Sequence, residues 1–134
     1  MGLFTFFTKK NAGQFISEKQ FKSNTANQLQ MTPQTLSQLE KYGVTGENEL
    51  KLEFFFYSNT LDKVERLSIE LNKLNYDVKA GQAEGDKSLF IATGWTGKMK
   101  MDSHTVMTWT KDMCELGYKF DCEFDGWGTM PDQN

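Results

Sequence analysis

The sequence predicts a mixed α+β fold of the ferredoxin-like type. This is a βαββαβ sandwich in which a four-stranded antiparallel sheet carries two helices on one face, preceded by an N-terminal helical extension. Three observations lead to it. Four segments with strand patterns and two with helical patterns alternate after residue 50, most aromatic residues lie in that region, and 134 residues make one domain. Right-handed crossovers then place the last strand beside the first.

The first predicted strand and helix follow directly from hydrophobic spacing. Residues 50–57 alternate at strand period, which separates Phe54 and Phe56 on one face from Phe55 and Tyr57 on the other. Asn59 or Thr60 is expected to begin the next helix. Its apolar residues recur every three or four positions: Leu61, Val64, Leu67, Leu71 and Leu74. Ile69 falls nearly opposite this stripe and is expected to be exposed.

The second half repeats the strand and helix patterns. Strands are predicted over about 76–82 and over 88–94, the latter apolar on both faces as a central strand should be. Asp102 or Ser103 is expected to begin the second helix. The last strand is predicted over 119–125, where Asp121, Glu123 and Asp125 share one face. These three acidic residues should therefore lie beside the first strand on the uncovered face of the sheet.

The front of the chain has a different character. Residues 1–30 are expected to form an N-terminal extension, either flexible or weakly helical, and residues 31–134 a single domain. Within 31–43 the pattern predicts a helix that Thr32 caps, that Pro33 enters and that Gly43 ends. Residues 1–10 have too short an apolar run for a secretory signal, and Phe6 breaks the myristoylation pattern.

Composition excludes several classes of function. The net charge of -3 and the pI near 5.2 argue against a binder of nucleic-acid phosphates. Cys114 and Cys122 are expected to be buried and reduced. Two cysteines and one histidine do not make a zinc site. No apolar run is long enough to span a bilayer, so a cytoplasmic protein is expected.

Each candidate group has a structural as well as a functional interpretation. Asp121, Glu123 and Asp125, about 7 Å apart along a strand, could hold a divalent cation or act as an acid/base pair, but a solvated face or a docking patch for a basic partner is far more common. Phe55 and Tyr57 on an open sheet suggest RNA stacking, yet the strand motif of RNA-recognition domains is absent. These two rings fit a partner site or a packing surface for the N-terminal extension equally well.

Three further side chains leave alternatives open. Trp95 and Trp127 each follow a glycine, and their rings either cap the core or form interface hot spots. His104, near a helix start, is expected to be an ordinary surface histidine. No catalytic residue, cofactor-binding residue or metal ligand is predicted, and the chain is not expected to be an enzyme.

From about Met31 to Thr129 the sequence resembles the ribonuclease E inhibitor family known as regulator of ribonuclease E activity B, or RraB. The similarity lies in residues 39–43 (LEKYG), 53–57 (EFFFY), 74–78 (LNYDV) and 93–96 (TGWT), and most specifically in 125–129 (DGWGT). It implies a small acidic α+β domain that binds an endoribonuclease and lowers its activity. Residues 1–30 match nothing assigned to that family.

The sequence therefore favours a non-enzymatic, protein-binding regulator without cofactors, and the resemblance implies an endonuclease of the ribonuclease E/G class as its partner. Direct contact with nucleic acid is not expected. The alternative is an immunity protein that neutralises a toxin through its acidic surface. The candidate partner-binding residues are Phe55, Tyr57, Trp95, Asp121, Glu123, Asp125 and Trp127.

Overall fold

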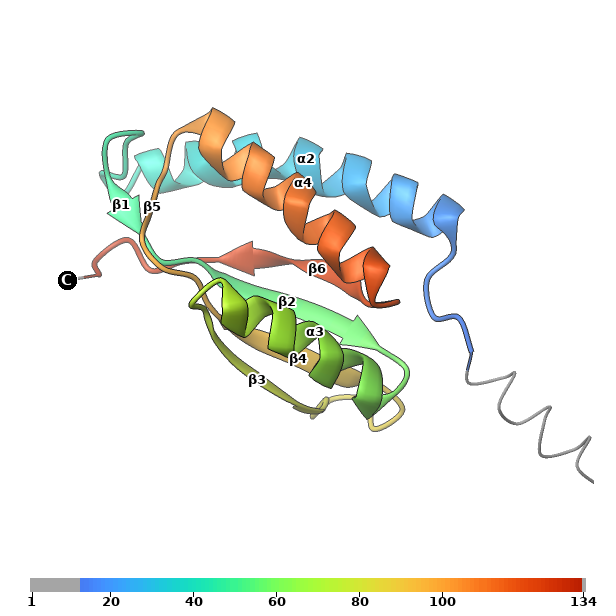
Figure 1. Ribbon diagram of the computed structural model, residues 1–134. Helices are drawn as coiled ribbons and strands as arrows, with labels where there is room; N and C mark the ends of the chain where they lie inside the picture. Colours follow the sequence, from blue (N-terminus) through green and yellow to red (C-terminus); the bar gives the residue numbers. More distant parts are fainter. Residues whose placement is uncertain (1–12, 134) are drawn as a thin grey trace, which may run out of the picture.

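The computed structural model describes residues 13–133 and has a mixed α+β fold with antiparallel sheets (Figure 1). The elements that carry the sheet are β2 (Glu53–Ser58), α3 (Leu61–Lys73), β3 (Asp77–Gln82), β4 (Phe90–Trp95), α4 (Ser103–Lys119) and β6 (Glu123–Gly128). The strand order is β3-β4-β2-β6, and every neighbouring pair is antiparallel. The last strand lies beside the first, as the sequence predicts. The predictions for residues 1–10 fall outside the described residues.

A second, two-stranded sheet lies next to the main one. It pairs β1 (Glu49–Leu50) with β5 (Met99–Lys100). The predicted strand over 50–57 is therefore divided in two. Leu52, in the gap, still bonds to the segment that follows β4, since its carbonyl accepts from the Thr96 N–H and its own N–H donates to the Thr96 hydroxyl.

The first described helix, α2 (Glu18–Glu40), is longer than predicted. It begins at Ser17, whose hydroxyl accepts from the Gln20 N–H while the Gln20 side chain accepts from the Ser17 N–H. This capping box is stronger than the local signal at residues 32–33. The predicted cap Thr32 is wrong, because Thr32 is buried inside α2 with its hydroxyl 3.3 Å from that of Thr110 on α4.

The core lies between the sheet and the helices. Phe54, Phe56 and Phe124 are fully buried there, and the Trp109 ring meets Phe124 edge-on at a centroid distance of 5.8 Å. Gly117 of α4 permits this packing, since a Cβ there would lie 2.9 Å from the Phe56 ring. Burial of four aromatic side chains supplies several kcal/mol of stability.

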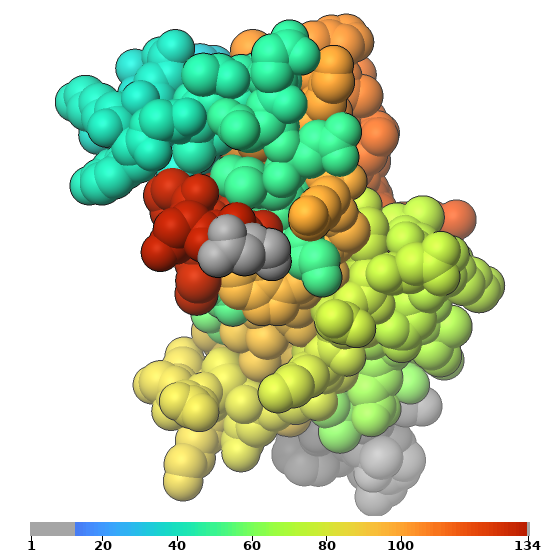
Figure 2. Space-filling model, turned by 90° about the vertical axis from the view of Figure 1, so that its left-hand side faces the viewer, coloured from blue at the N-terminus to red at the C-terminus, as the bar shows by residue number. Residues whose placement is uncertain are grey.

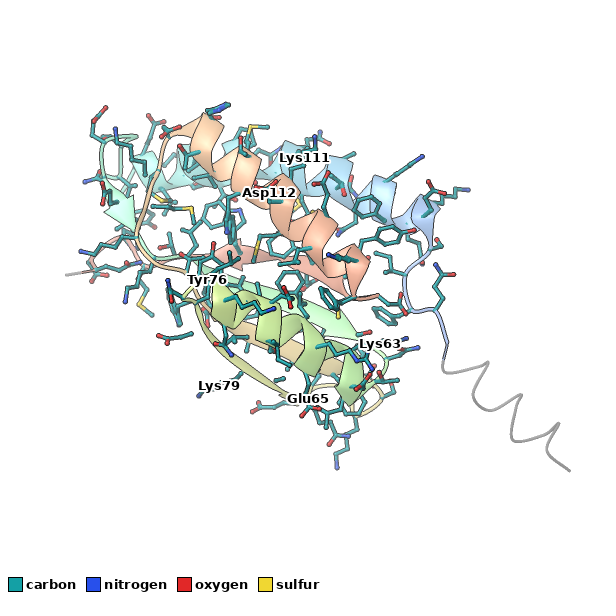
Figure 3. The ribbon with its side chains drawn as sticks, in the orientation of Figure 1. Lys63, Glu65, Tyr76, Lys79, Lys111 and Asp112 are labelled. Carbon is teal, nitrogen blue, oxygen red and sulfur yellow. The ribbon has the colours of Figure 1, made fainter. Side chains whose placement is uncertain are left out.

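A hydrogen bond between side chains also ties the residue before β3 to the core. The indole N–H of Trp109 donates to the Tyr76 hydroxyl at 3.2 Å. Tyr76 lies between the end of α3 and the start of β3 (Figure 3). Burial raises the pKa of this hydroxyl, and the hydrogen bond that its oxygen accepts from Trp109 opposes part of that rise.

The last strand begins later than predicted. Helix α4 extends to Lys119, Phe120 follows it, and β6 starts only at Glu123. Between them Asp121 has φ +57, a left-handed conformation that Asp adopts more readily than most residues. This turn removes Asp121 from the strand. The segment with Gly126 and Trp127 belongs to β6.

Candidate functional site

The open face of the sheet is defined by the residues that alternate with the buried core residues. On β2 these are Glu53, Phe55 and Tyr57, all partly exposed, whereas Phe54 and Phe56 between them have no exposed surface. The strand register adds neighbouring residues of the same face: Ile91, Thr93, Trp95, Asp77, Lys79, Gly81 and Glu123. In Figure 2, α3 lies on one side of the strands and the loop between β3 and β4 (yellow) projects toward the other.

Five of the seven candidate residues gather on or beside this face. Tyr57 pairs with Glu123 across β2 and β6, and Trp95 ends the neighbouring strand β4. Asp125 occupies the bulge where the β2–β6 register shifts, is exposed, and lines a small hollow together with Phe55. Three rings and two carboxylates are thereby brought to one surface.

The described part of the N-terminal extension packs elsewhere. The Phe21 ring stacks on Tyr118 of α4 at 4.2 Å, and the Asn24 side chain donates to the Phe124 carbonyl on the outer edge of β6. Phe55 and Tyr57 stay partly exposed. Within residues 13–133, the extension therefore closes the β6 edge, with Gln28 beside Phe55 in a small hollow, and it leaves both rings partly exposed.

Asp121 has a structural position instead, so its predicted place in a common acidic row is wrong. Its carboxylate accepts from the backbone N–H groups of Phe15 at 2.7 Å and Ile16 at 3.0 Å. The same carboxylate forms an ion pair with Lys63 of α3 at 2.6 Å, both side chains being about four-fifths buried. Lys63 also donates to the Gly13 carbonyl. Figure 3 shows Lys63 near the first turn of α3. We call Asp121 and Lys63 the clamp.

Trp127 lies apart from this face, at the first of the two positions that the sequence left open for its ring. It pairs with Phe54, which points into the core, and its indole N–H donates to the Thr32 hydroxyl at 3.3 Å. Gly126 before it has φ +130, which few other residues adopt. The geometry places the Trp127 ring on the helix side of the sheet, against the core cluster.

The two carboxylates that remain on the open face are electrostatically unfavourable. Burial raises the pKa of Glu123, and the nearby charge of Asp125 raises it further. Partial loss of hydration raises the pKa of Asp125 as well, although much of this residue is exposed. No ion pair among residues 13–133 involves either carboxylate, whereas the clamp neutralises Asp121. A cation supplied by a partner would relieve this cost.

Two hollows on the open face were not expected from the sequence. One, of about 590 Å³, has Tyr57, Leu89 and Ile91 in its lining and the acidic residues Glu84 and Asp86 beside them. The other, of about 560 Å³, lies along Trp95 and Thr93 with Glu53 and Asp77. The predicted apolar character of both faces of β4 was the signal for Ile91. The acidic residues gave no signal, because they come from separate elements.

Other chemistry is not supported by clusters in the described residues. Within residues 13–133, no three His, Cys, Asp or Glu side chains are grouped so as to hold a metal. Both cysteines are free and buried, and burial raises the pKa of Cys114 to about 11 and of Cys122 to about 12. Among the described helices, none is long and apolar enough to cross a membrane.

The fold and the open face define a small α+β protein with an exposed aromatic and acidic surface. Comparison with known proteins gives its family. The family described as regulator of ribonuclease activity B matches residues 29–129, which include the sheet, α3, α4 and the second half of α2. The chain belongs to this RraB family. Its membership supports a role in regulating ribonuclease activity through a protein partner. No curated protein matches the chain.

Proposed function

We propose that this protein is a non-enzymatic regulator that binds an endonuclease of the ribonuclease E/G class through its open face and lowers its activity. The observation that carries the proposal is the joint presence of the family match and of three rings with two uncompensated carboxylates on that face. The βαββαβ order and the strand order support a ferredoxin-like sandwich as the scaffold.

The chemistry of the face fits a ribonuclease surface. An enzyme that binds RNA presents Lys and Arg to phosphates, and Glu123 and Asp125 offer the opposite charge. Docking would pair both carboxylates with cations, which would offset their partial desolvation, and the charge attraction would speed association at low salt. Phe55, Tyr57 and Trp95 supply the ring surface from which interface hot spots are built. Occupation of the RNA-binding surface then lowers the rate of cleavage.

Charge reversal tests the proposal. Purified wild-type protein should slow the cleavage of a fluorogenic RNA by a ribonuclease E-type enzyme, and salt should weaken the effect. The double variant Glu123→Lys, Asp125→Lys should lose inhibition at least tenfold, because it places like charges against the basic surface. Its matched control is Asp112→Lys, Glu115→Lys, which makes the same charge change at two exposed positions of α4.

The two parts of the proposal fail separately. If wild-type protein neither binds nor slows the enzyme, the ribonuclease partner is wrong. If both double variants inhibit as the wild type does, the enzyme is the partner but the carboxylates of the open face are not its docking site.

A further inference from the structure

The two edges of the main sheet are treated differently. The β6 edge is covered by α2, whose side chains Asn24 and Gln28 donate to the Phe124 carbonyl. The opposite edge is β3, four of whose six residues are exposed. In Figure 1, β3 is the outermost strand of the sheet. An uncovered edge offers unpaired N–H and C=O groups to another chain.

The hydrogen-bond pattern shows which groups these are. The Ala83 N–H donates to the Leu89 carbonyl, and the register continues from this pair through Gln82 opposite Phe90. Bonded and non-bonded pairs alternate in antiparallel strands. Asp77, Lys79 and Gly81 therefore bond to β4. The residues between them, Val78, Ala80 and Gln82, direct their N–H and C=O groups away from the sheet.

The hydrogen bonds between β4 and β2 independently identify the same outward-facing residues of β3. The Thr96 N–H donates to the Leu52 carbonyl, which fixes the alternation between β2 and β4. Gly94 and Ala92 then bond to β2, and Thr93 and Ile91 are left to bond to β3. Thr93 and Ile91 are opposite Lys79 and Gly81, which is consistent with the bonding of these two β3 residues to β4.

The side chains next to the β3 edge indicate which features a bound strand should have. On the open face β3 presents Asp77, Lys79 and Gly81, and a Cβ at Gly81 would have no atom within 4 Å. A side chain of an added strand opposite Gly81 could therefore cross β3 and reach Tyr57 and Ile91 in the 590 Å³ hollow. Four residues further along, a side chain would lie opposite Asp77.

The charges around β3 indicate which kind of segment can bind there. Four exposed or partly exposed carboxylates surround this strip, against two lysines: Glu53, Asp77, Glu84 and Asp86, with Lys79 and Lys87. A second copy paired about Ala80 would bring Glu84 of one chain close to Asp77 of the other, which is repulsive. A basic strand suffers no such repulsion.

We propose that β3 is a strand-addition site for an extended, basic segment of a protein partner, which carries an apolar residue opposite Gly81 and a Lys or Arg four residues away opposite Asp77. Such a segment gains affinity from main-chain hydrogen bonds to Val78, Ala80 and Gln82, and specificity from its alternate side chains. The geometry stands on its own. Only the assignment of the segment to a ribonuclease rests on the proposed function.

A defined peptide tests the site. The probe is a blocked nonapeptide of threonines with leucine at position 4 and lysine at positions 2 and 8; the control peptide has glutamate in place of both lysines. In free protein, amide exchange should be fast at Val78, Ala80 and Gln82 and slow at Lys79 and Gly81. The basic peptide should slow exchange at the first three, and the acidic peptide should not. Equal response to both peptides, or none, overturns the proposal.

Substitutions at two positions test the backbone hydrogen bonds and the hollow separately. Ala80→Pro removes an outward N–H without breaking the ladder to β4, as edge strands tolerate, and should weaken peptide binding about tenfold or more. Ala80→Ser keeps the N–H and should bind as wild type. Gly81→Val fills the hollow and should also reduce binding. A folded Ala80→Pro that binds normally, or a wild-type dimer that Ala80→Pro dissociates, overturns strand addition by a basic partner.

The ribonuclease assay keeps this inference distinct from the proposed function. Full inhibition of the enzyme by Ala80→Pro would overturn β3 as the partner's site and leave the proposed function standing. Inhibition lost in Ala80→Pro but kept in Ala80→Ser supports both.

Discussion

The clamp between Asp121 and Lys63 makes a quantitative prediction about stability. Asp121→Ala removes a carboxylate that accepts two backbone N–H bonds, from Phe15 and Ile16, and pairs with Lys63. Hydrogen bonds to charged groups contribute about 1.5–3 kcal/mol each. Because Asp121 and Lys63 retain about a fifth of their side-chain exposure, water replaces part of what is lost. We expect a net loss of about 2–3 kcal/mol.

Urea unfolding measures this loss. With a slope of about 2 kcal/mol per molar urea, the midpoint should fall by about 1–1.5 M. Asp121→Asn keeps the size of the side chain and the tolerance for φ +57, and should lose about half as much. Asp121→Gly should be about 1 kcal/mol more stable than Asp121→Ala, because glycine adopts the left-handed conformation without strain.

The refuting results are equally specific. An Asp121→Ala protein within about 0.5 kcal/mol of wild type would show that the clamp is an ordinary surface contact. Asp121→Asn combined with Lys63→Met should lose less than the sum of the single losses, since the two side chains interact. Strict additivity would contradict the ion pair as a source of stability.

Three further predictions concern other parts of the molecule. Glu123→Gln should raise the free energy of unfolding at neutral pH, and comparison of unfolding between pH 4 and 8 checks this. A carboxyl whose folded-state pKa is raised costs nothing below its unfolded pKa and loses stability as the pH rises through the folded pKa. Trp127→Ala should lose about 2–3 kcal/mol in a urea titration, because the ring packs against the core; unchanged stability with lost binding would assign it to the interface. Cys114 and Cys122 should react with iodoacetamide at pH 8 at least about a hundredfold more slowly than free cysteine, since burial keeps both thiols protonated; rapid labelling of the native protein would contradict their burial.

Residue spacing was sufficient for the elements of the sheet. The alternation of Phe54 and Phe56 with Phe55 and Tyr57 predicted which rings are buried, and the structure confirms it. The cap at Asp102 and the exposure of Ile69 are confirmed as well. These features depend on local geometry and on one hydrophobic face, and both can be predicted from a short stretch of sequence.

The misplaced features depend on contacts between distant residues. Helix α2 continues through Pro33 because residues 18–30, although polar, pack along α4 and the β6 edge. Asp121 reads as a strand residue by alternation, but its backbone turns left-handed to reach Lys63 and residues 15–16. No window of sequence contains both sides of such a contact. The site at the β3 edge could not be predicted from the sequence for the same reason, since the neighbouring residues Tyr57 and Ile91 come from two other strands.

The acidic run at the end of the chain therefore has two physical roles. Asp121 is neutralised within the molecule, where it joins the segment before α2 to α3 and to the end of α4. Glu123 and Asp125, two and four residues later, are desolvated on the open face and have no cation beside them among the described residues. A protein selected for stability alone would gain by neutral residues at these two positions. Their cost in stability is explained if a basic partner supplies the missing positive charge. The charge-reversal variant measures the contribution of these carboxylates to binding, and Glu123→Gln measures their cost to the stability of the free protein.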